Sequence, residues 1–247
     1  MILTKRGITR HVPNTITLLN LVVGCLSIAS AFEGNLLLAA YLIVVAACFD
    51  FLDGLAARIL KSYSPLGKEL DSLADAVSFG VAPSVILYQL LKAVLAVPYD
   101  EGFATGHTIL VIPFIMAAFS ALRLAMFNVD SRQTTSFIGL PTPANALYTA
   151  GLVLGLYSPY HSLFHPLVSS ASAIVVMVLV QSALLVSPIP MFSLKLKSLR
   201  WGEAGVQIIF FALSCALILL LGVAALAPII LLYLSISLVS WAIKSIQ

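Results

Sequence analysis

Four aspartates stand in or beside strongly apolar stretches of this chain, at Asp50, Asp53, Asp71 and Asp75. An acid at the centre of a membrane helix costs about 3 kcal/mol, so four unpaired acids would cost on the order of 10 kcal/mol. That cost is tolerable if the acids face a polar cavity, a cation or one another. Carboxylates at this density are hard oxygen ligands suited to Mg²⁺ or Mn²⁺. The four residues therefore predict a site for divalent metal.

Two small residues and an arginine lie on the same predicted helix face as the first two acids. Asp50, Asp53, Gly54, Ala57 and Arg58 follow an i, i+3, i+4, i+7, i+8 pattern, so they lie on one face if the stretch is helical. Gly54 and Ala57 leave that face bare, which lets a ligand approach the backbone closely. Arg58 can fork onto phosphate oxygens. Because Mg²⁺ is usually held by few carboxylates together with substrate phosphates, this face predicts a pyrophosphate site.

The second two acids predict a matching face on the next helix. Gly67, Asp71, Asp75 and Ser78 recur at i, i+4, i+8 and i+11. The connection over residues 61–68 is short and contains a proline and a glycine, so the two helices are expected to be antiparallel neighbours. Their acidic faces can then converge. One of the aspartates could take the proton of an attacking hydroxyl group.

The elements that must position these acids are membrane helices. Of the 247 residues, 61% are hydrophobic and only 9% are charged, with a mean hydropathy of +1.08, whereas a soluble domain carries about 25% charged residues. We therefore predict an all-α, polytopic transmembrane bundle with about eight spans. They are residues 15–32, 36–60, 70–97, 108–127, 142–157, 167–186, 204–221 and 223–243. The last two are either a tight hairpin or one long feature.

Charge placement gives the orientation of these spans. All basic residues but Lys92, which leans to the opposite side, fall on one side: Lys5, Arg6, Arg10, Arg58, Lys61, Lys68, Arg123, Arg132, Lys195, Lys197, Arg200 and Lys244. The opposite segments carry Glu33, Asp100 and Glu101. This asymmetry places both termini, and the aspartates, on the cytoplasmic side of an inner membrane. Basic residues form no stripe of the kind that binds nucleic acid, so no nucleic-acid partner is expected.

Two alternatives to a catalytic metal site remain open from the residues alone. The acids could pair with Arg58, Lys61 and Lys68 and merely hold two helices together. They could instead form an ion or proton relay in an ion-coupled membrane transporter, although the repeated halves typical of many carriers are absent.

The complete spacing is Asp-x2-Asp-Gly-x2-Ala-Arg-x8-Gly-x3-Asp-x3-Asp, from Asp50 to Asp75, and it resembles the signature of the CDP-alcohol phosphotransferases in every fixed position. The resemblance implies a six-helix core followed here by two C-terminal helices. It also implies that one or two Mg²⁺ or Mn²⁺ ions are held by Asp50, Asp53, Asp71 and Asp75, and that Asp75, with Asp71, deprotonates the acceptor alcohol. The implied CDP-binding residues are Gly54, Ala57, Arg58, Gly67, Asn14 and Thr17.

Further segments, residues 13–20, 67–83, 121–129 and 137–144, resemble the phosphatidylserine synthase branch of this family. That likeness implies CDP-diacylglycerol as donor, L-serine as acceptor, and phosphatidylserine and CMP as products. The acceptor-binding residues suggested by these segments and their surroundings are Arg123, Asn128, Arg132 and Gly139.

The acceptor is the least constrained part of this expectation. The carboxylate of L-serine needs a cation, which Arg123 or Arg132 could supply. Met126, however, stands where the family usually has a basic residue. Glycerol 3-phosphate or an inositol phosphate therefore remains an alternative acceptor.

The chain is expected to divide into a membrane core at residues 1–190 and a C-terminal loop and helical hairpin at residues 191–247. Gly151 and Gly155 form a G-x-x-x-G pattern in the fifth predicted span, which is typical of close helix packing within one chain or between two. The protein is expected to lie among membrane lipids as a homodimer.

Overall fold

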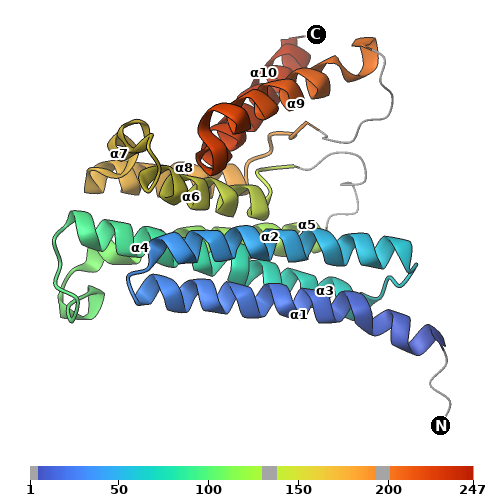
Figure 1. The fold of residues 1–247 in the computed structure, drawn as a ribbon, viewed down its shortest axis with the longest axis horizontal. Helices are drawn as coiled ribbons and strands as arrows, with labels where there is room; N and C mark the ends of the chain where they lie inside the picture. The colour runs from blue at the N-terminus through green and yellow to red at the C-terminus, as the bar shows by residue number, and fades with distance from the viewer. Residues whose placement is uncertain (1–4, 130–137, 193–200, 247) are drawn as a thin grey trace.

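The computed structural model describes residues 5–129, 138–192 and 201–246, and these are helical nearly throughout (Figure 1). Within these ranges no strand is present beyond an isolated bridge between Ile138 and Pro190. The prediction of an all-α polytopic bundle is confirmed. The α-helices are α1 (Lys5–Phe32), α2 (Leu36–Ile59), α3 (Pro65–Asp75), α4 (Ala82–Val94), α5 (Pro113–Val129), α6 (Thr142–Leu156), α7 (His161–Val168), α8 (Ala171–Leu185), α9 (Trp201–Leu221) and α10 (Leu226–Ile246). A π-helical segment, Ala76–Val81, joins α3 to α4, and the 3₁₀ turns are Phe103–Thr105, Thr108–Val111 and Gly222–Ala225.

Five helical stretches are long and apolar enough to cross a membrane, and a sixth results if α7 and α8, bent by 85°, count as one span. One of the five, Gly205–Ile243, is 39 residues long and contains α9, a 3₁₀ turn and α10. Gly222, at φ +58°, nevertheless divides it into the hairpin of α9 and α10, which decides between the two sequence interpretations. Helices α6 and α8 have 15 residues each, about 22 Å, which is shorter than the roughly 30 Å hydrocarbon core.

Local signals in the sequence explain where the first helices end. Gly34 has φ +81°, a left-handed conformation that glycine adopts without strain, and it lets the chain reverse after α1. Asn35 then caps α2, because its Oδ1 accepts a hydrogen bond from the Leu38 N–H at 3.0 Å. Ser64 caps α3 in the same way by accepting from the Gly67 N–H at 3.0 Å, with Pro65 in the first turn.

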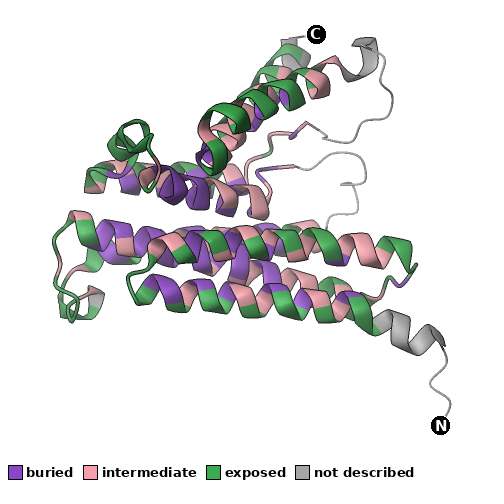
Figure 2. Cartoon of the chain, viewed as in Figure 1, coloured by how far each residue is buried: buried purple, intermediate pink, exposed green. Residues whose placement is uncertain are grey.

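The stretch formed by α3, the π-helical segment and α4 is the centre of the bundle. In its most apolar window 72% of the residues are buried, against 33% or less in the other four stretches (Figure 2). Helices α1, α2, α5 and α6 pack around it. Gly24 on α1 allows a close approach to the π-helical segment, where the Ser78 hydroxyl donates to the Asn20 carbonyl at 3.0 Å.

The C-terminal helices cover one side of this core, with α10 packed along α6. The predicted G-x-x-x-G pattern is used inside the chain. A Cβ on Gly151 would meet the Ala227 backbone at the start of α10, and one on Gly155 would meet the Phe164 ring on α7. The two glycines therefore permit close packing of α6 against its own neighbours.

Candidate active site

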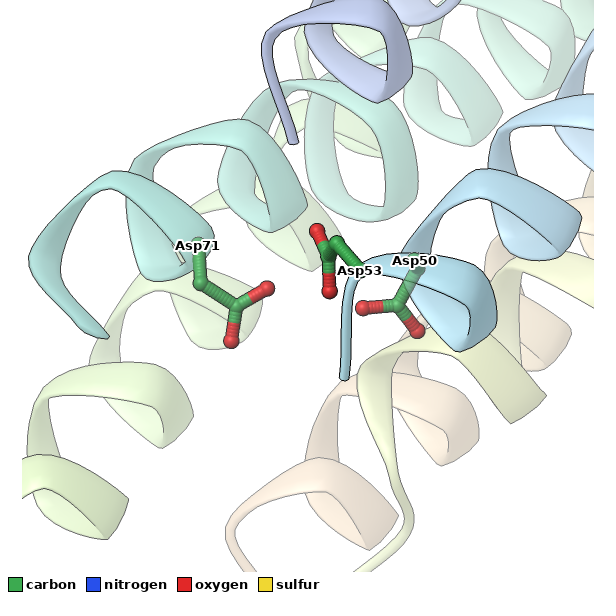
Figure 3. Close-up of side chains that lie close together, drawn as sticks. All are labelled: Asp50, Asp53 and Asp71. Carbon is green, nitrogen blue, oxygen red and sulfur yellow. The ribbon is translucent and has the colours of Figure 1, made fainter. Parts of the chain in front are cut away.

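Three of the predicted carboxylates converge on one small space. Asp50 and Asp53 come from α2 and Asp71 from α3, and one oxygen of each lies within 4.8 Å of the others. Figure 3 shows the three side chains facing the same space from the two helices. We call these residues the aspartate cluster. Asp75, one turn beyond Asp71, lies outside the cluster but lines the same cavity as Asp50 and Asp71.

These acids are not neutralised by bases. Among the described side chains, no lysine or arginine nitrogen lies within 4.0 Å of the four carboxylates. The ion pair present among those side chains joins His107 to Glu101, elsewhere in the molecule. Lys68 instead donates to a backbone carbonyl, and the Arg58 Nε donates to the Gly54 carbonyl at 2.9 Å. The interpretation in which ion pairs merely fix two helices is therefore not supported.

The cluster has the properties of a cation site. Asp53 and Asp75 are 6% and 7% exposed. One oxygen of Asp71 and one of Asp75 are buried with no hydrogen-bond partner in the described structure. Buried anionic oxygens without partners carry a large desolvation cost, which a cation would offset. Oxygen donors alone suit Mg²⁺ or Mn²⁺, so the residues present fit such an ion.

Helix α1 holds one carboxylate of the aspartate cluster in place. The Thr17 hydroxyl donates to Oδ2 of Asp53 at 2.6 Å, and Thr17 itself is buried, at 3% exposed. A short bond of this kind to a carboxylate fixes the rotamer of the acid. Sequence reasoning placed Thr17 near the nucleotide; its hydrogen bond to Asp53 could not be read from the sequence because the two residues lie on different helices.

A first cavity, of about 220 Å³, opens on one side of the cluster, and we call it the α1–α2 cavity. Asp53 and Asp71 belong to its wall. Five of the six predicted CDP-binding residues line it: Asn14, Thr17, Gly54, Ala57 and Gly67. Arg58, the sixth, is exposed and does not line the cavity, although its guanidinium remains beside Gly54.

A second cavity, of about 320 Å³, opens on the other side, and we call it the α3–α5 cavity. It shares Asp71 and Lys68 with the α1–α2 cavity. Its remaining walls come from α2, α3, α5 and the start of α6: Asp50, Ser72, Asp75, Arg123, Leu124, Phe127, Asn128, Pro141, Thr142 and Pro143. The aspartate cluster therefore stands where two cavities meet.

Two cations face the α3–α5 cavity. Arg123 is 7% exposed, its Nη1 is 3.5 Å from the Thr142 hydroxyl, and its Nε is buried without a partner. The Lys68 ammonium donates to the Asn128 carbonyl at 3.0 Å. The Asn128 amide in turn donates to the Ser72 hydroxyl at 2.9 Å, which ties the end of α5 to α3. Lys68 and Thr142 were missed as site residues, although Lys68 directly follows the predicted Gly67.

Of the other predicted acceptor residues, Arg132 lies outside the described residues, and Gly139 does not line the α3–α5 cavity. Gly139 has φ +75°, and a Cβ there would meet the Leu185 carbonyl oxygen. Its N–H donates to the Ile189 carbonyl at 2.9 Å, so it holds the entry to α6 against the end of α8. Met126 is 49% exposed and lines a different cavity, beside Ile138.

Comparison with known proteins agrees with these features. A family profile described as CDP-alcohol phosphatidyltransferase matches residues 10–186. A CDP-diacylglycerol–serine O-phosphatidyltransferase of Mycobacterium leprae is 35% identical over 239 residues, which covers 94% of this chain and 75% of that protein. Proteins of the same name from Helicobacter pylori strain J99 and Saccharomyces cerevisiae are each 37% identical, over 153 and 162 residues. The chain spans 60% of the Helicobacter pylori protein and 53% of the yeast protein.

Proposed function

Because the chain belongs to the CDP-alcohol phosphatidyltransferase family, we propose that it transfers the phosphatidyl group of CDP-diacylglycerol to the hydroxyl of L-serine and releases CMP. The observation that carries the proposal is the meeting of two cavities at Asp71. One cavity is lined by the small residues suited to a nucleotide, and the other contains Asp75 and two cations. The names of the relatives support serine as the acceptor.

The α1–α2 cavity takes the CDP group in this proposal. Gly54, Ala57 and Gly67 give it a wall without long side chains, so the diphosphate can approach the helix backbones. Asn14 supplies an amide for polar contacts with the nucleotide. Arg58 lies close enough to turn toward the phosphates if its bond to the Gly54 carbonyl is exchanged for one to phosphate oxygen.

The aspartate cluster, with Asp75, holds one or two Mg²⁺ or Mn²⁺ ions. When bound, such an ion supplies Lewis-acid stabilisation of the charge that develops on the diphosphate as CMP departs. The residues of the chain keep the ligands oriented, chiefly through the bond from Thr17 to Asp53.

The acceptor is bound in the α3–α5 cavity. Arg123 and Lys68 are the cations available to the serine carboxylate, and Arg123 has a buried Nε with no partner in the described structure. The carboxylates of the cavity can receive the serine ammonium. Both ends of the amino acid are thereby held, which leaves the hydroxyl as the group that reacts.

Asp75 takes the hydroxyl proton, because it lines the α3–α5 cavity, belongs to the wall away from the nucleotide residues, and has a free buried oxygen. The serine oxygen forms a bond to the β-phosphorus of CDP-diacylglycerol. The bond from that phosphorus to the bridging oxygen breaks, and CMP leaves with the electron pair. Phosphatidylserine and CMP are the products, and the proton passes from Asp75 to solvent.

In this proposal the reaction takes place at the cytoplasmic face of the inner membrane. Figure 1 shows the start of α1 and the end of α2 at the same end of the bundle, and Asp50 and Asp53 lie in the last third of α2, toward that end. The distribution of basic residues supports the assignment of this end to the cytoplasmic side. CMP and serine then exchange with the cytoplasm while the acyl chains stay in the lipid.

Release of CMP by the purified protein tests the proposal. We expect CMP from CDP-diacylglycerol only when L-serine and Mg²⁺ or Mn²⁺ are both present, and loss of the activity when EDTA removes the metal. Activity with glycerol 3-phosphate or an inositol phosphate, and none with serine, would move the chain to another branch of the family. Solute flux into liposomes without CMP formation would instead favour an ion-coupled transporter.

A further inference from the structure

A third cavity, of about 320 Å³, lies between α6, α8 and α10, away from the aspartate cluster, and we call it the α6–α8 cavity. None of the residues placed in the proposed reaction lines it. Most of its wall is apolar, with Leu167, Met177 and Leu234 among the lining side chains. Its volume falls within the range of about 300–1,000 Å³ that is usual for small-molecule pockets.

Two amide side chains in this cavity have no partner. Asn145 on α6 is fully buried and Gln181 on α8 is 5% exposed, and both line the cavity. Neither the nitrogen nor the oxygen of either amide makes a hydrogen bond in the described structure. A buried amide without a partner costs about 1–3 kcal/mol, and little water reaches the apolar interior of a membrane to offset this cost.

The two amides and the apolar wall lie at different ends of the cavity. Asn145 is three residues from the start of α6 and Gln181 is four residues from the end of α8. The Leu140 N–H donates to the Leu184 carbonyl, so these two helix ends adjoin, and both amides lie about 4–6 Å along their helices from that point. From Gln181 back to Ala173 the α8 wall is apolar for about 12 Å. The cavity is polar at the end where α6 begins and α8 ends, and apolar farther along α8.

The cavity is open toward the surrounding lipid. Val176 and Val180 on α8 are 59% and 52% exposed, and Leu231 on α10 is 45% exposed, while all three line the cavity. These residues lie in apolar helices. A ligand can therefore enter sideways from the bilayer, without passing through water.

We propose that the α6–α8 cavity binds one ester-linked acyl chain of a membrane lipid. The chain lies along the apolar α8 wall, and its ester carbonyl accepts hydrogen bonds from the Asn145 and Gln181 amides. The ester carbonyl of a glycerolipid stands at one end of its acyl chain, as the two amides stand at one end of the apolar wall. This site is separate from the reaction, although the start of α6 forms part of both cavities: Thr142 faces the α3–α5 cavity and Asn145 the α6–α8 cavity.

The test uses the full chain in nanodiscs of phosphatidylglycerol containing a trace of a phospholipid with a photoreactive diazirine in its acyl chain. After irradiation, labelled peptides are mapped by mass spectrometry. We expect the label on α6 and α8 peptides that line the cavity. Ala173→Phe, which fills the apolar end, should reduce this labelling. Ala183→Phe is the matched control, because Ala183 is an exposed residue of the same helix and lines none of the cavities described.

A second comparison tests the two amides directly. An ether-linked probe has the same chain but no carbonyl, so we expect the ester probe to compete about three- to tenfold better. The double variant Asn145→Leu, Gln181→Leu should lose this preference while still folding, because it removes buried polar groups without partners. Equal competition by ester and ether lipids in the unsubstituted protein would overturn the proposal. So would unchanged labelling in Ala173→Phe, or crosslinks between two protein chains at α8 with no lipid attached.

The lipid can be a bulk phospholipid or the donor substrate itself. Unlabelled CDP-diacylglycerol added in increasing amounts separates these sources. If the donor's own chain occupies the cavity, it should displace the probe at lower concentration than phosphatidylglycerol does. If a bulk phospholipid occupies the cavity, the two lipids should displace the probe equally. Both results support an acyl-ester site. Because the labelling needs no turnover, absence of CMP formation would overturn the proposed reaction and leave this inference standing.

Discussion

The replacement Thr17→Val isolates the hydrogen bond that orients one proposed metal ligand. Valine has nearly the shape of threonine, so the packing of α1 is kept while the hydroxyl that donates to Asp53 at 2.6 Å is lost. The same hydroxyl contacts the Pro13 carbonyl at 3.0 Å, one turn back on α1. That bond supports only the local helix, so its loss has little effect on the site.

The expected effect follows from the geometry of the bond. A hydrogen bond to a charged group contributes about 1.5–3 kcal/mol, and this bond is short and buried. Since about 1.4 kcal/mol corresponds to a factor of ten, the metal concentration that gives half-maximal activity should rise about 10- to 100-fold. At saturating metal, most of the turnover should return, because Asp53 itself remains.

The assay is CMP release titrated with Mn²⁺ at fixed lipid and serine concentrations. Thr15→Val is the matched control: Thr15 is exposed on the same helix, and its hydroxyl donates only to the His11 carbonyl at 2.9 Å. Its metal titration should coincide with that of the unsubstituted protein. If Thr17→Val also gives an unchanged metal titration, Asp53 does not depend on Thr17, and the role of α1 at the site is wrong.

Three further changes test two other residues of the site and one backbone position outside it. Asp75→Asn should lower kcat by about 100-fold or more while metal-dependent binding of CDP-diacylglycerol persists; turnover within about tenfold of normal would exclude Asp75 as the base. Gly139→Ala and Gly34→Ala both place alanine at positive φ, but only Gly139 lacks space for a Cβ. Gly139→Ala should therefore destabilise the protein by about 1–3 kcal/mol more than Gly34→Ala in detergent unfolding, and equal losses would refute this. Gly54→Ala should fold normally, because the nearest atom to its Cβ is 3.9 Å away. It should raise the KM for CDP-diacylglycerol about tenfold or more if the diphosphate approaches the backbone there, and an unchanged KM would place the diphosphate elsewhere.

Much of the site could be predicted from the sequence because its residues lie on two successive helices. The spacing of Asp50 and Asp53, and that of Asp71, indicated which faces would meet, and a short connection made the two helices neighbours. The helical periodicity of 3.6 residues was sufficient for this step. The overall all-α architecture followed from composition and the length of the apolar stretches.

Contacts between distant helices could not be predicted in the same way. The bond from Thr17 to Asp53 and the approach of Arg123 to Thr142 depend on how α1, α5 and α6 pack, which periodicity does not determine. From the sequence, Lys68 was interpreted as a sign of membrane orientation or as a possible ion-pair partner of the aspartates, because a basic residue beside an apolar stretch is usually a topology signal. Its place between two cavities required the structure.

Backbone geometry was a second feature that the sequence could not predict. The π-helical segment Ala76–Val81 is mostly apolar, and its sequence does not distinguish a π-helical turn from an α-helical one. Gly139 was assigned to the acceptor from its place in a family-like segment, whereas its positive φ and its contact with Leu185 explain the glycine without any ligand. A glycine required by the backbone and a glycine required by a substrate look the same in one sequence.

The contact between Gly24 and the π-helical segment lies outside the candidate active site, yet it helps to set how closely α1 approaches the aspartate cluster. A single methyl group added at Gly24 would stand 2.8 Å from the Ser78 Cα, a backbone atom that cannot rotate aside. Relief of the strain requires α1 and the π-helical segment to move apart, and Thr17, seven residues away on α1, would move with that helix. Substitutions should thus be tolerated least where two helices touch bare backbone, about 10 Å along α1 from the hydroxyl that donates to Asp53.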